Sequence, residues 1–218
     1  MRKTFVILSS LALAFVSCQK AEDKKVTTTT TVATDTVTDA AGAAEKEAPV
    51  DQETMMKAWK AYATPGDVHK MMAAETGKWN CEMSFWQGPD SPAEKAKATA
   101  DIKMVLGGRY QEANYTGTVM GQPFEGKATT GYNNASGKLF TTFYDNMGTG
   151  MMHAEGTYDP ASKKATYEGK MVDPISGKSL KYREEYVVVD ENTRKTSMFD
   201  TKNGTEYKSM EIVMVRAK

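Results

Sequence analysis

The chain has 218 residues, which is long enough for one domain with a sizeable hydrophobic core. Its 28 basic and 28 acidic residues cancel, so no net charge attracts it to nucleic acid, and none is expected as a partner. The sequence contains no serine-nucleophile elbow, phosphate-binding loop or dinucleotide-binding glycine pattern. These observations favour a non-enzymatic role without a cofactor.

Residues 1–17 have the pattern of a signal peptide. Arg2 and Lys3 precede an apolar run that is too short to span a bilayer. The run ends at Ser17-Cys18, and a small residue followed by cysteine at this point resembles the lipobox of bacterial lipoproteins. The resemblance implies cleavage before Cys18, lipidation of Cys18 and anchoring in the bacterial cell envelope, on the periplasmic or outer face of the outer membrane. The alternative is an ordinary secretory signal with an incidental cysteine.

Residues 18–50 are expected to form a disordered linker between the lipid and the folded domain. Thr27–Thr31 is an unbroken threonine run, and most of the remainder consists of charged residues, alanine and further threonine. The segment has no aromatic residue and no sustained hydrophobic period. It therefore cannot bury enough apolar surface to offset the entropy lost on ordering.

Residues 51–76 are predicted to form two short helices. Met55, Ala58, Trp59 and Tyr62 share one face of the first, and Val68, Met71, Met72 and Glu75 share one face of the second. The Thr64–Asp67 segment separates the helices, and Gly77 ends the second. A methionine and aromatic stripe at helical spacing is typical of a packing face. We therefore expect a helical collar that lies against a sheet.

Residues 77–218 have the rhythm of a β-meander, with runs of Thr, Tyr, Phe and Val separated by turns rich in Gly, Asn, Asp and Pro. Ten strands are predicted, at residues 78–86, 98–106, 109–119, 124–132, 138–145, 150–158, 164–172, 179–189, 193–200 and 205–216. An open sheet of this kind would leave two exposed edges, which closure into an up-and-down barrel removes. The predicted fold is mainly β: a closed antiparallel barrel of about ten strands, wide enough to leave an internal cavity.

Two resemblances support this fold. Gly77-x-Trp79 at the start of the first strand, with Arg216 near the end of the last, is similar to the lipocalin and fatty-acid-binding (calycin) superfamily. In that superfamily the tryptophan closes one end of the barrel and an arginine from the last strand stacks over it, which implies structural roles for Trp79 and Arg216. The region from Pro65 to Arg216 resembles the bacterial domain-of-unknown-function 1579 family. That resemblance implies a lipocalin-like barrel and no assigned activity. The motifs that carry it are Pro65-Gly66-x-x-His69, Leu106-Gly107-Gly108-Arg109, Pro123-Phe124-x-Gly126, Gly131-Tyr132-Asn133, Asp145-Asn146-Met147-Gly148-Thr149, Gly156-x-Tyr158-Asp159 and Asp173-Pro174-x-x-Gly177.

The candidate ligand-binding residues are one carboxylate and a set of tyrosines. Glu184 lies between Tyr182 and Tyr186 on an apolar strand face, so it is either buried with a raised pKa or paired with a basic neighbour such as Arg183. Tyrosine combines an apolar ring with a polar tip, which suits a ligand cavity and an ordinary barrel core equally. The tyrosines that recur on successive strands are Tyr132, Tyr144, Tyr167 and Tyr182.

No metal site is expected. The two histidines, His69 and His153, have no ligand spacing to other candidate ligands. Cys81, the cysteine of the predicted barrel, is interpreted as a small buried hydrophobe, because its strand context offers little to lower its pKa.

Three functions remain open. The first is a lipid-anchored barrel that binds a small apolar or amphipathic molecule through the residues named above. The second is a scaffold or interaction module with a filled barrel, and the third is an acid–base enzyme that uses Glu184. A cavity of ligand size would separate the first from the second, and the sequence does not indicate the ligand or the oligomeric state.

Overall fold

The computed structural model describes residues 50–218. The predicted signal peptide, the lipid attachment at Cys18 and the linker up to residue 49 lie outside the described residues. Among the helices of the described part, none is long and apolar enough to cross a membrane.

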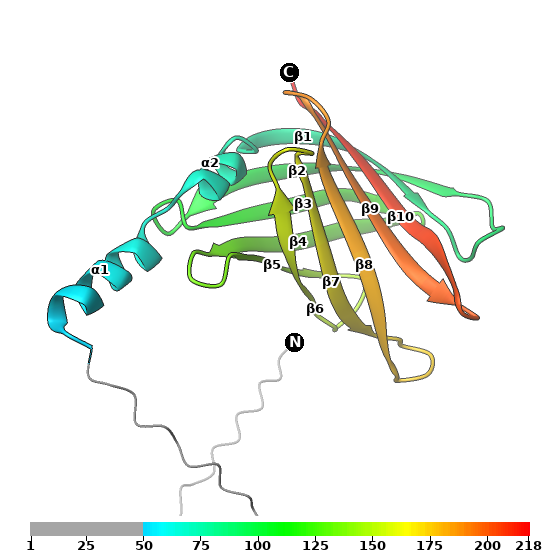
Figure 1. Cartoon of the computed structure of the whole chain (residues 1–218). Coiled ribbons are helices and arrows are strands. Elements are labelled where there is room, and N and C mark those ends of the chain that lie inside the picture. Colours follow the sequence, from blue (N-terminus) through cyan, green and yellow to red (C-terminus); the bar gives the residue numbers. More distant parts are fainter. Residues whose placement is uncertain (1–49) are drawn as a thin grey trace, which may run out of the picture. The chain divides into compact units, whose positions relative to one another are not determined.

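Ten antiparallel strands form a closed barrel, as Figure 1 shows. Each strand pairs with its neighbours in the chain, and the first strand closes the barrel by pairing with the last. The strands are β1 (Gly77–Phe85), β2 (Glu94–Val105), β3 (Tyr110–Val119), β4 (Gln122–Asn133), β5 (Lys138–Asp145), β6 (Met152–Asp159), β7 (Lys164–Val172), β8 (Ser179–Val188), β9 (Thr193–Lys202) and β10 (Thr205–Arg216). The predicted antiparallel up-and-down barrel of about ten strands is confirmed.

The predicted start of β2 is four residues late. The strand begins at Glu94 rather than at residue 98, and Lys95 and Lys97 pair with β1. Alanine and lysine are depleted in strands, so local composition gave no signal there. The inward alternation of Ala96, Ala98 and Ala100 nevertheless continues through this segment.

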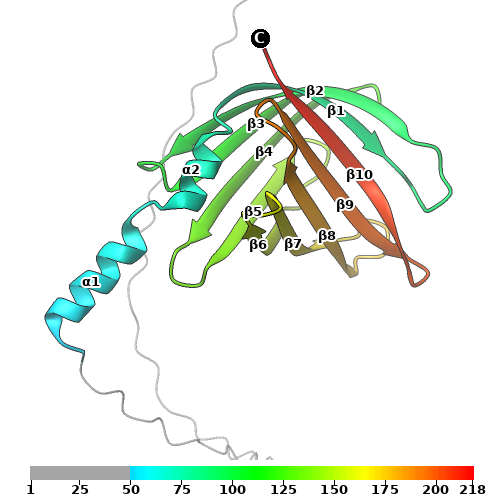
Figure 2. The same cartoon turned by 45° about the horizontal axis from the view of Figure 1, so that its top comes forward.

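Two helices precede the barrel, α1 (Gln52–Ala63) and α2 (Asp67–Ala73). Helix α2 packs against β2, β3 and β4 and buries His69 and Met72. Figure 2 shows it at the barrel end where β1 begins.

Helix α1 does not pack against the sheet, so that part of the expectation is wrong. None of its residues is buried, and Trp59 is 63% exposed. Asn134, in the β4–β5 turn, donates hydrogen bonds from Nδ2 to the carbonyls of Ala61, Tyr62 and Thr64. These bonds fix the end of α1 to a turn rather than to the face of the sheet, and its apolar stripe stays exposed in the described structure.

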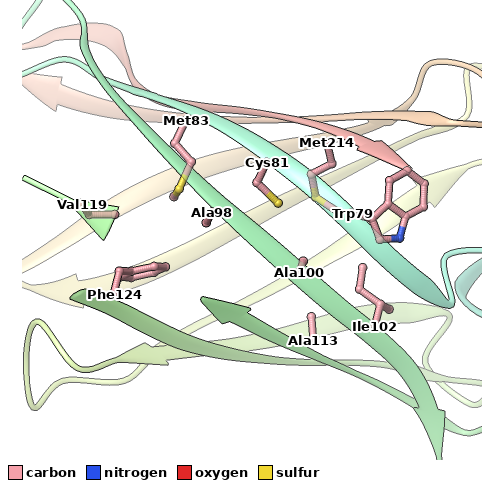
Figure 3. Packing of buried hydrophobic residues seen from close by; sticks show 10 residues of the cluster. All are labelled: Trp79, Cys81, Met83, Ala98, Ala100, Ile102, Ala113, Val119, Phe124 and Met214. Carbon is pink, nitrogen blue, oxygen red and sulfur yellow. The ribbon is translucent and has the colours of Figure 1, made fainter. Parts of the chain in front are cut away.

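The buried core lies inside the barrel in two clusters. The first comes from β1 to β4 and β10, and Figure 3 shows its side chains between Trp79 at one end and Val119 and Phe124 at the other. The second comes from α2 and β5 to β8 and includes Leu139 and Tyr167. Between the two clusters the interior is not filled.

Candidate functional site

One end of the barrel is closed around Trp79. Its side chain is fully buried, and its indole nitrogen donates a hydrogen bond to the Glu75 carbonyl at 2.8 Å. The guanidinium carbon of Arg216 lies 4.3 Å from the centroid of the Trp79 ring system, and that of Arg194 lies 5.1 Å from it. Both are within the range of a cation–π contact.

Arg216 also ties the chain before β1 to the end of β10. Its two terminal nitrogens donate hydrogen bonds to the carbonyls of Thr76 and Ala74, each at 2.8 Å. These carbonyls follow the last turn of α2, where backbone acceptors lack helical partners. Arg216 therefore closes the seam between the first and last strands and holds α2 over it.

A buried ion pair completes this closed end. Arg194 Nε lies 2.8 and 2.7 Å from the two carboxylate oxygens of Glu75, and both side chains are 4% exposed. The same guanidinium donates to the carbonyls of Asp190 and Thr193. Arg194 is therefore paired with one carboxylate and hydrogen-bonded to two carbonyls at the closed end of the barrel.

The opposite end forms an open mouth. All the turns that follow the odd-numbered strands lie there, because α2 and the start of β1 are at the other end and the strands alternate in direction. These turns and the end of β7 carry large apolar side chains that are exposed to solvent: Met120, Met147, Met151, Val172 and Ile175. The mouth therefore has an apolar rim.

Between the two ends lies a cavity of about 550 Å³. Protein sites for small molecules typically measure roughly 300–1,000 Å³. Most of the lining is apolar, and ten of the chain's fifteen methionines contribute to it. These are Met71, Met72, Met83, Met120, Met147, Met152, Met171, Met198, Met210 and Met214.

Glu184 projects into the cavity from the middle of β8. It pairs with Tyr167 of β7 on one side and with Met198 of β9 on the other. No hydrogen bond or ion pair within residues 50–218 involves its carboxylate. Burial raises the pKa of Glu184 to about 7, from an ordinary value of 4.5.

Three tyrosines on three different strands, Tyr115, Tyr167 and Tyr182, line the cavity together with Glu184. Burial, and next the nearby charge of Glu184, raises the pKa of Tyr167. Burial likewise raises the pKa of Tyr115, on β3, with smaller effects from Cys81 and Glu184. Burial and the charges of Glu184 and Asp200 raise the pKa of Tyr182 to about 12. All three phenols therefore stay neutral near pH 7, and all three side chains line the cavity.

A glycine makes room for one of these rings. A Cβ atom at Gly169, on β7, would lie 2.3 Å from Cζ and 2.5 Å from the hydroxyl oxygen of Tyr182. These separations are too short for any side chain, so only glycine at this position leaves room for the Tyr182 ring.

The cavity contains most but not all of the predicted site residues. Tyr167, Tyr182 and Glu184 line it. Tyr132 does not; its ring packs edge-on against His69, with centroids 5.8 Å apart. Tyr144 is 42% exposed and lies on the outside, because its neighbour Phe143 occupies the inward position on β5. The candidate site therefore excludes Tyr132 and Tyr144.

Four residues of the interior were absent from the predicted site, although the sequence pattern places Tyr186 on the same strand face as Glu184. Tyr115, Tyr186 and Asp200 line the cavity, and Arg194 pairs with Glu75 below it. Each lies at an inward position of its strand. Following the inward–outward alternation along β3, β8 and β9 would have identified these positions. The partner of Arg194 was not predictable in this way, since Glu75 lies just beyond α2 and comes from a distant part of the chain.

The other residues considered from the sequence, Cys81, His69 and His153, have structural or exposed positions. The Cys81 thiol is buried, and burial raises its pKa to about 11. His69 Nδ1 accepts a hydrogen bond from the Gly66 amide at the start of α2, and the His153 side chain is on the exposed side of β6. No group of three His, Cys, Asp or Glu residues in the described part of the chain is arranged to hold a metal ion.

Two solved structures have a similar fold. The crystal structure of Rv2717c from M. tuberculosis has a TM-score of 0.54 at 12% sequence identity, and the match covers 71% of this chain and 100% of that one. The S-type phycobiliprotein lyase CPES from Guillardia theta has a TM-score of 0.50 at 11% identity, covering 70% of this chain and 94% of that one. At such identities the likeness shows the fold alone.

The sequence itself identifies the family. No curated protein matches it. The family described as "Protein of unknown function (DUF1579)" matches over residues 64–216, a range that contains α2 and all ten strands. The resemblance found in the turn motifs is thus confirmed, and the chain belongs to the DUF1579 family of proteins of unknown function.

Proposed function

We propose that the barrel binds one small amphipathic molecule in its cavity. The observation that carries this proposal is a cavity of about 550 Å³ that is lined mainly by apolar side chains and contains the unpaired carboxyl of Glu184. Protein interiors are close-packed and tolerate few large voids. A space of ligand size with a few polar groups is the usual form of a small-molecule site.

The composition of the wall suits an adaptable apolar ligand. Methionine is unbranched and polarizable, so it adjusts to different shapes with little cost in packing. Tyr115, Tyr167 and Tyr182 supply hydroxyl groups that orient a polar end. The scaffold alternative, which requires a barrel packed solid with side chains, is less well supported because of this cavity.

The open mouth provides a route for the ligand. Its exposed apolar rim includes Met120, Met147 and Ile175, and Met120 and Met147 also line the cavity. An apolar molecule would therefore meet apolar side chains at the rim that continue into the cavity wall. At the closed end, by contrast, Trp79, Glu75 and Arg194 are all buried.

We also propose that the protein is anchored in the bacterial cell envelope through a lipid on Cys18. The support is the signal-peptide pattern of residues 1–17 and the position of Cys18 directly after it. Metabolic labelling with a radioactive fatty acid should mark the wild-type chain and not Cys18→Ala. Equal labelling of the two would refute this part of the proposal.

The ligand proposal is tested by titrating the barrel with Nile red, a neutral apolar dye whose fluorescence rises in apolar surroundings. We expect one dye per barrel. Two adjacent threonines on β5 give a matched pair of variants. Thr141 lines the cavity, and Thr142 points the other way. Thr141→Trp should fill the cavity and abolish the fluorescence increase, and Thr142→Trp should leave it unchanged.

An equal response of both variants would place the dye on the outer surface and would overturn the proposal. Thermal unfolding of each variant checks that the barrel remains folded. A dye that fails to bind the wild-type protein at all would have the same consequence.

A further inference from the structure

The charges along the cavity have one sign. Four carboxylates line it, and one of them, Glu75, is neutralised by Arg194 at the closed end. The other three are Asp145 at the mouth, Asp200 below it and Glu184 near the middle. No lysine, arginine or histidine in the described residues lines the cavity.

Asp200, on β9, is a second carboxylate in the cavity lining. Its Oδ1 atom is buried and has no hydrogen-bond partner within residues 50–218. An unsatisfied buried acceptor is costly, so a positive charge in the cavity near Asp200 would be stabilising. The charges of Asp200 and Glu184 both act on Tyr182, which places this ring near both carboxylates.

The groups around Glu184 are aromatic rather than basic. Tyr167 and Tyr182 lie on β7 and β8, and Tyr115, on β3, lines the same cavity. The basic neighbour in sequence, Arg183, points outward and pairs with Glu185 and Glu206. Carboxylates together with tyrosine rings are the groups that proteins use to hold ammonium ions, through charge attraction and cation–π contacts.

An anionic ligand would be repelled by these carboxylates. A carboxylate or phosphate head in this cavity would lie near Glu184 and Asp200, without a basic side chain among the lining residues to compensate it. Bringing like charges together in a site of low dielectric is strongly unfavourable. The lining therefore excludes anions as well as favouring cations.

From this arrangement we infer that the cavity takes a cationic amphiphile, namely an alkyl amine or alkyl quaternary ammonium. Its charged head lies against Glu184 and the surrounding tyrosines, with Asp200 within reach, and its apolar chain lies along the methionine wall. The inference rests on the proposed function, because it names the class of molecule that the same cavity binds.

The test is displacement of Nile red by three compounds that share a ten-carbon chain: decyltrimethylammonium, decanoate and decanol. The measurement is made at pH 8, above the pKa of about 7 for Glu184, so that its carboxylate is ionised. The head of decyltrimethylammonium carries its charge at every pH. We expect it to displace the dye at roughly thirtyfold lower concentration than decanoate, with decanol between them.

Variants assign the preference to the cavity. Glu184→Gln keeps the shape of the side chain and should weaken binding of the cation about tenfold, with decanol unchanged. Asp200→Asn should also weaken binding of the cation, and it serves as the second test if Glu184→Gln fails to fold. The matched control is Glu168→Gln, which removes the same charge from the exposed outer face of β7.

The outcomes separate the two proposals. If Nile red and decanol bind but decanoate competes as well as the cation, the inference about charge is wrong and the binding function stands. The inference is also wrong if Glu168→Gln weakens the cation as much as Glu184→Gln. If Nile red does not bind at all, the binding function itself fails and this inference fails with it.

Discussion

The closed end of the barrel depends on the buried Glu75–Arg194 pair, and Glu75→Gln is the variant that tests this dependence. Both side chains are 4% exposed, so removing the negative charge leaves the Arg194 guanidinium buried without its counter-ion. Breaking one partner of a buried pair typically costs about 3–5 kcal/mol. The carbonyls of Asp190 and Thr193 still accept from Arg194, so we expect about 3 kcal/mol, at the lower end of this range.

The assay is equilibrium unfolding in urea, with a double-mutant cycle. Arg194→Met removes the buried cation, so the Glu75→Gln/Arg194→Met double variant should be less destabilised than the sum of the single variants. The control is Glu82→Gln, which removes one partner of the exposed Glu82–Lys97 pair and should change stability by less than about 1 kcal/mol. A Glu75→Gln variant as stable as the Glu82→Gln control, with no coupling in the cycle, would refute the reasoning.

Three further predictions concern other buried groups. Trp79→Ala should destabilise the barrel by about 3–5 kcal/mol in the same assay, because it removes a fully buried ring that contacts Arg194, Arg216 and the Glu75 carbonyl. A melting temperature within a degree or two of wild type would contradict this. Glu184→Gln should stabilise the barrel by about 3 kcal/mol at pH 8 and by almost nothing at pH 4. The pKa of Glu184 is raised by folding, so between pH 4.5 and about 7 the folded state keeps a proton that the unfolded state releases, and above pH 7 the buried carboxylate destabilises the fold. An equal gain in urea stability at both pH values would show that ionisation of Glu184 is not the cause. Cys81 should react with a thiol reagent only on unfolding, since its thiol is buried and its pKa is raised to about 11. Rapid labelling of Cys81 in a native Cys18→Ala variant would contradict its assignment to the core.

Most of the barrel was predictable from local patterns. Turn residues and the period of two are encoded within a few neighbouring residues, so strands such as β5 and β7 were predicted with their observed bounds. The start of β2 was not, because its lysines and alanines have low strand propensity and are held there by pairing with β1. Tertiary pairing decided that boundary.

The site was predictable only in part, for a geometric reason. Alternation assigns a residue to one of two faces, and it placed Glu184 and Tyr182 together on β8, where both line the cavity. Tyr144 was included by residue type alone, although its inward-facing neighbour is Phe143. Contacts between distant segments, such as Glu75 with Arg194, depend on how the barrel closes and have no local signal.

The central claim is that the barrel cavity holds one amphipathic molecule against Glu184. A crystal structure of the protein grown with decyltrimethylammonium at saturating concentration tests it most directly. We predict electron density for one molecule inside the barrel, with its ammonium head in contact with the Glu184 carboxylate and the rings of Tyr115, Tyr167 or Tyr182. A barrel interior filled by rearranged methionine side chains, with the compound absent or bound only on the outer surface, would contradict the claim.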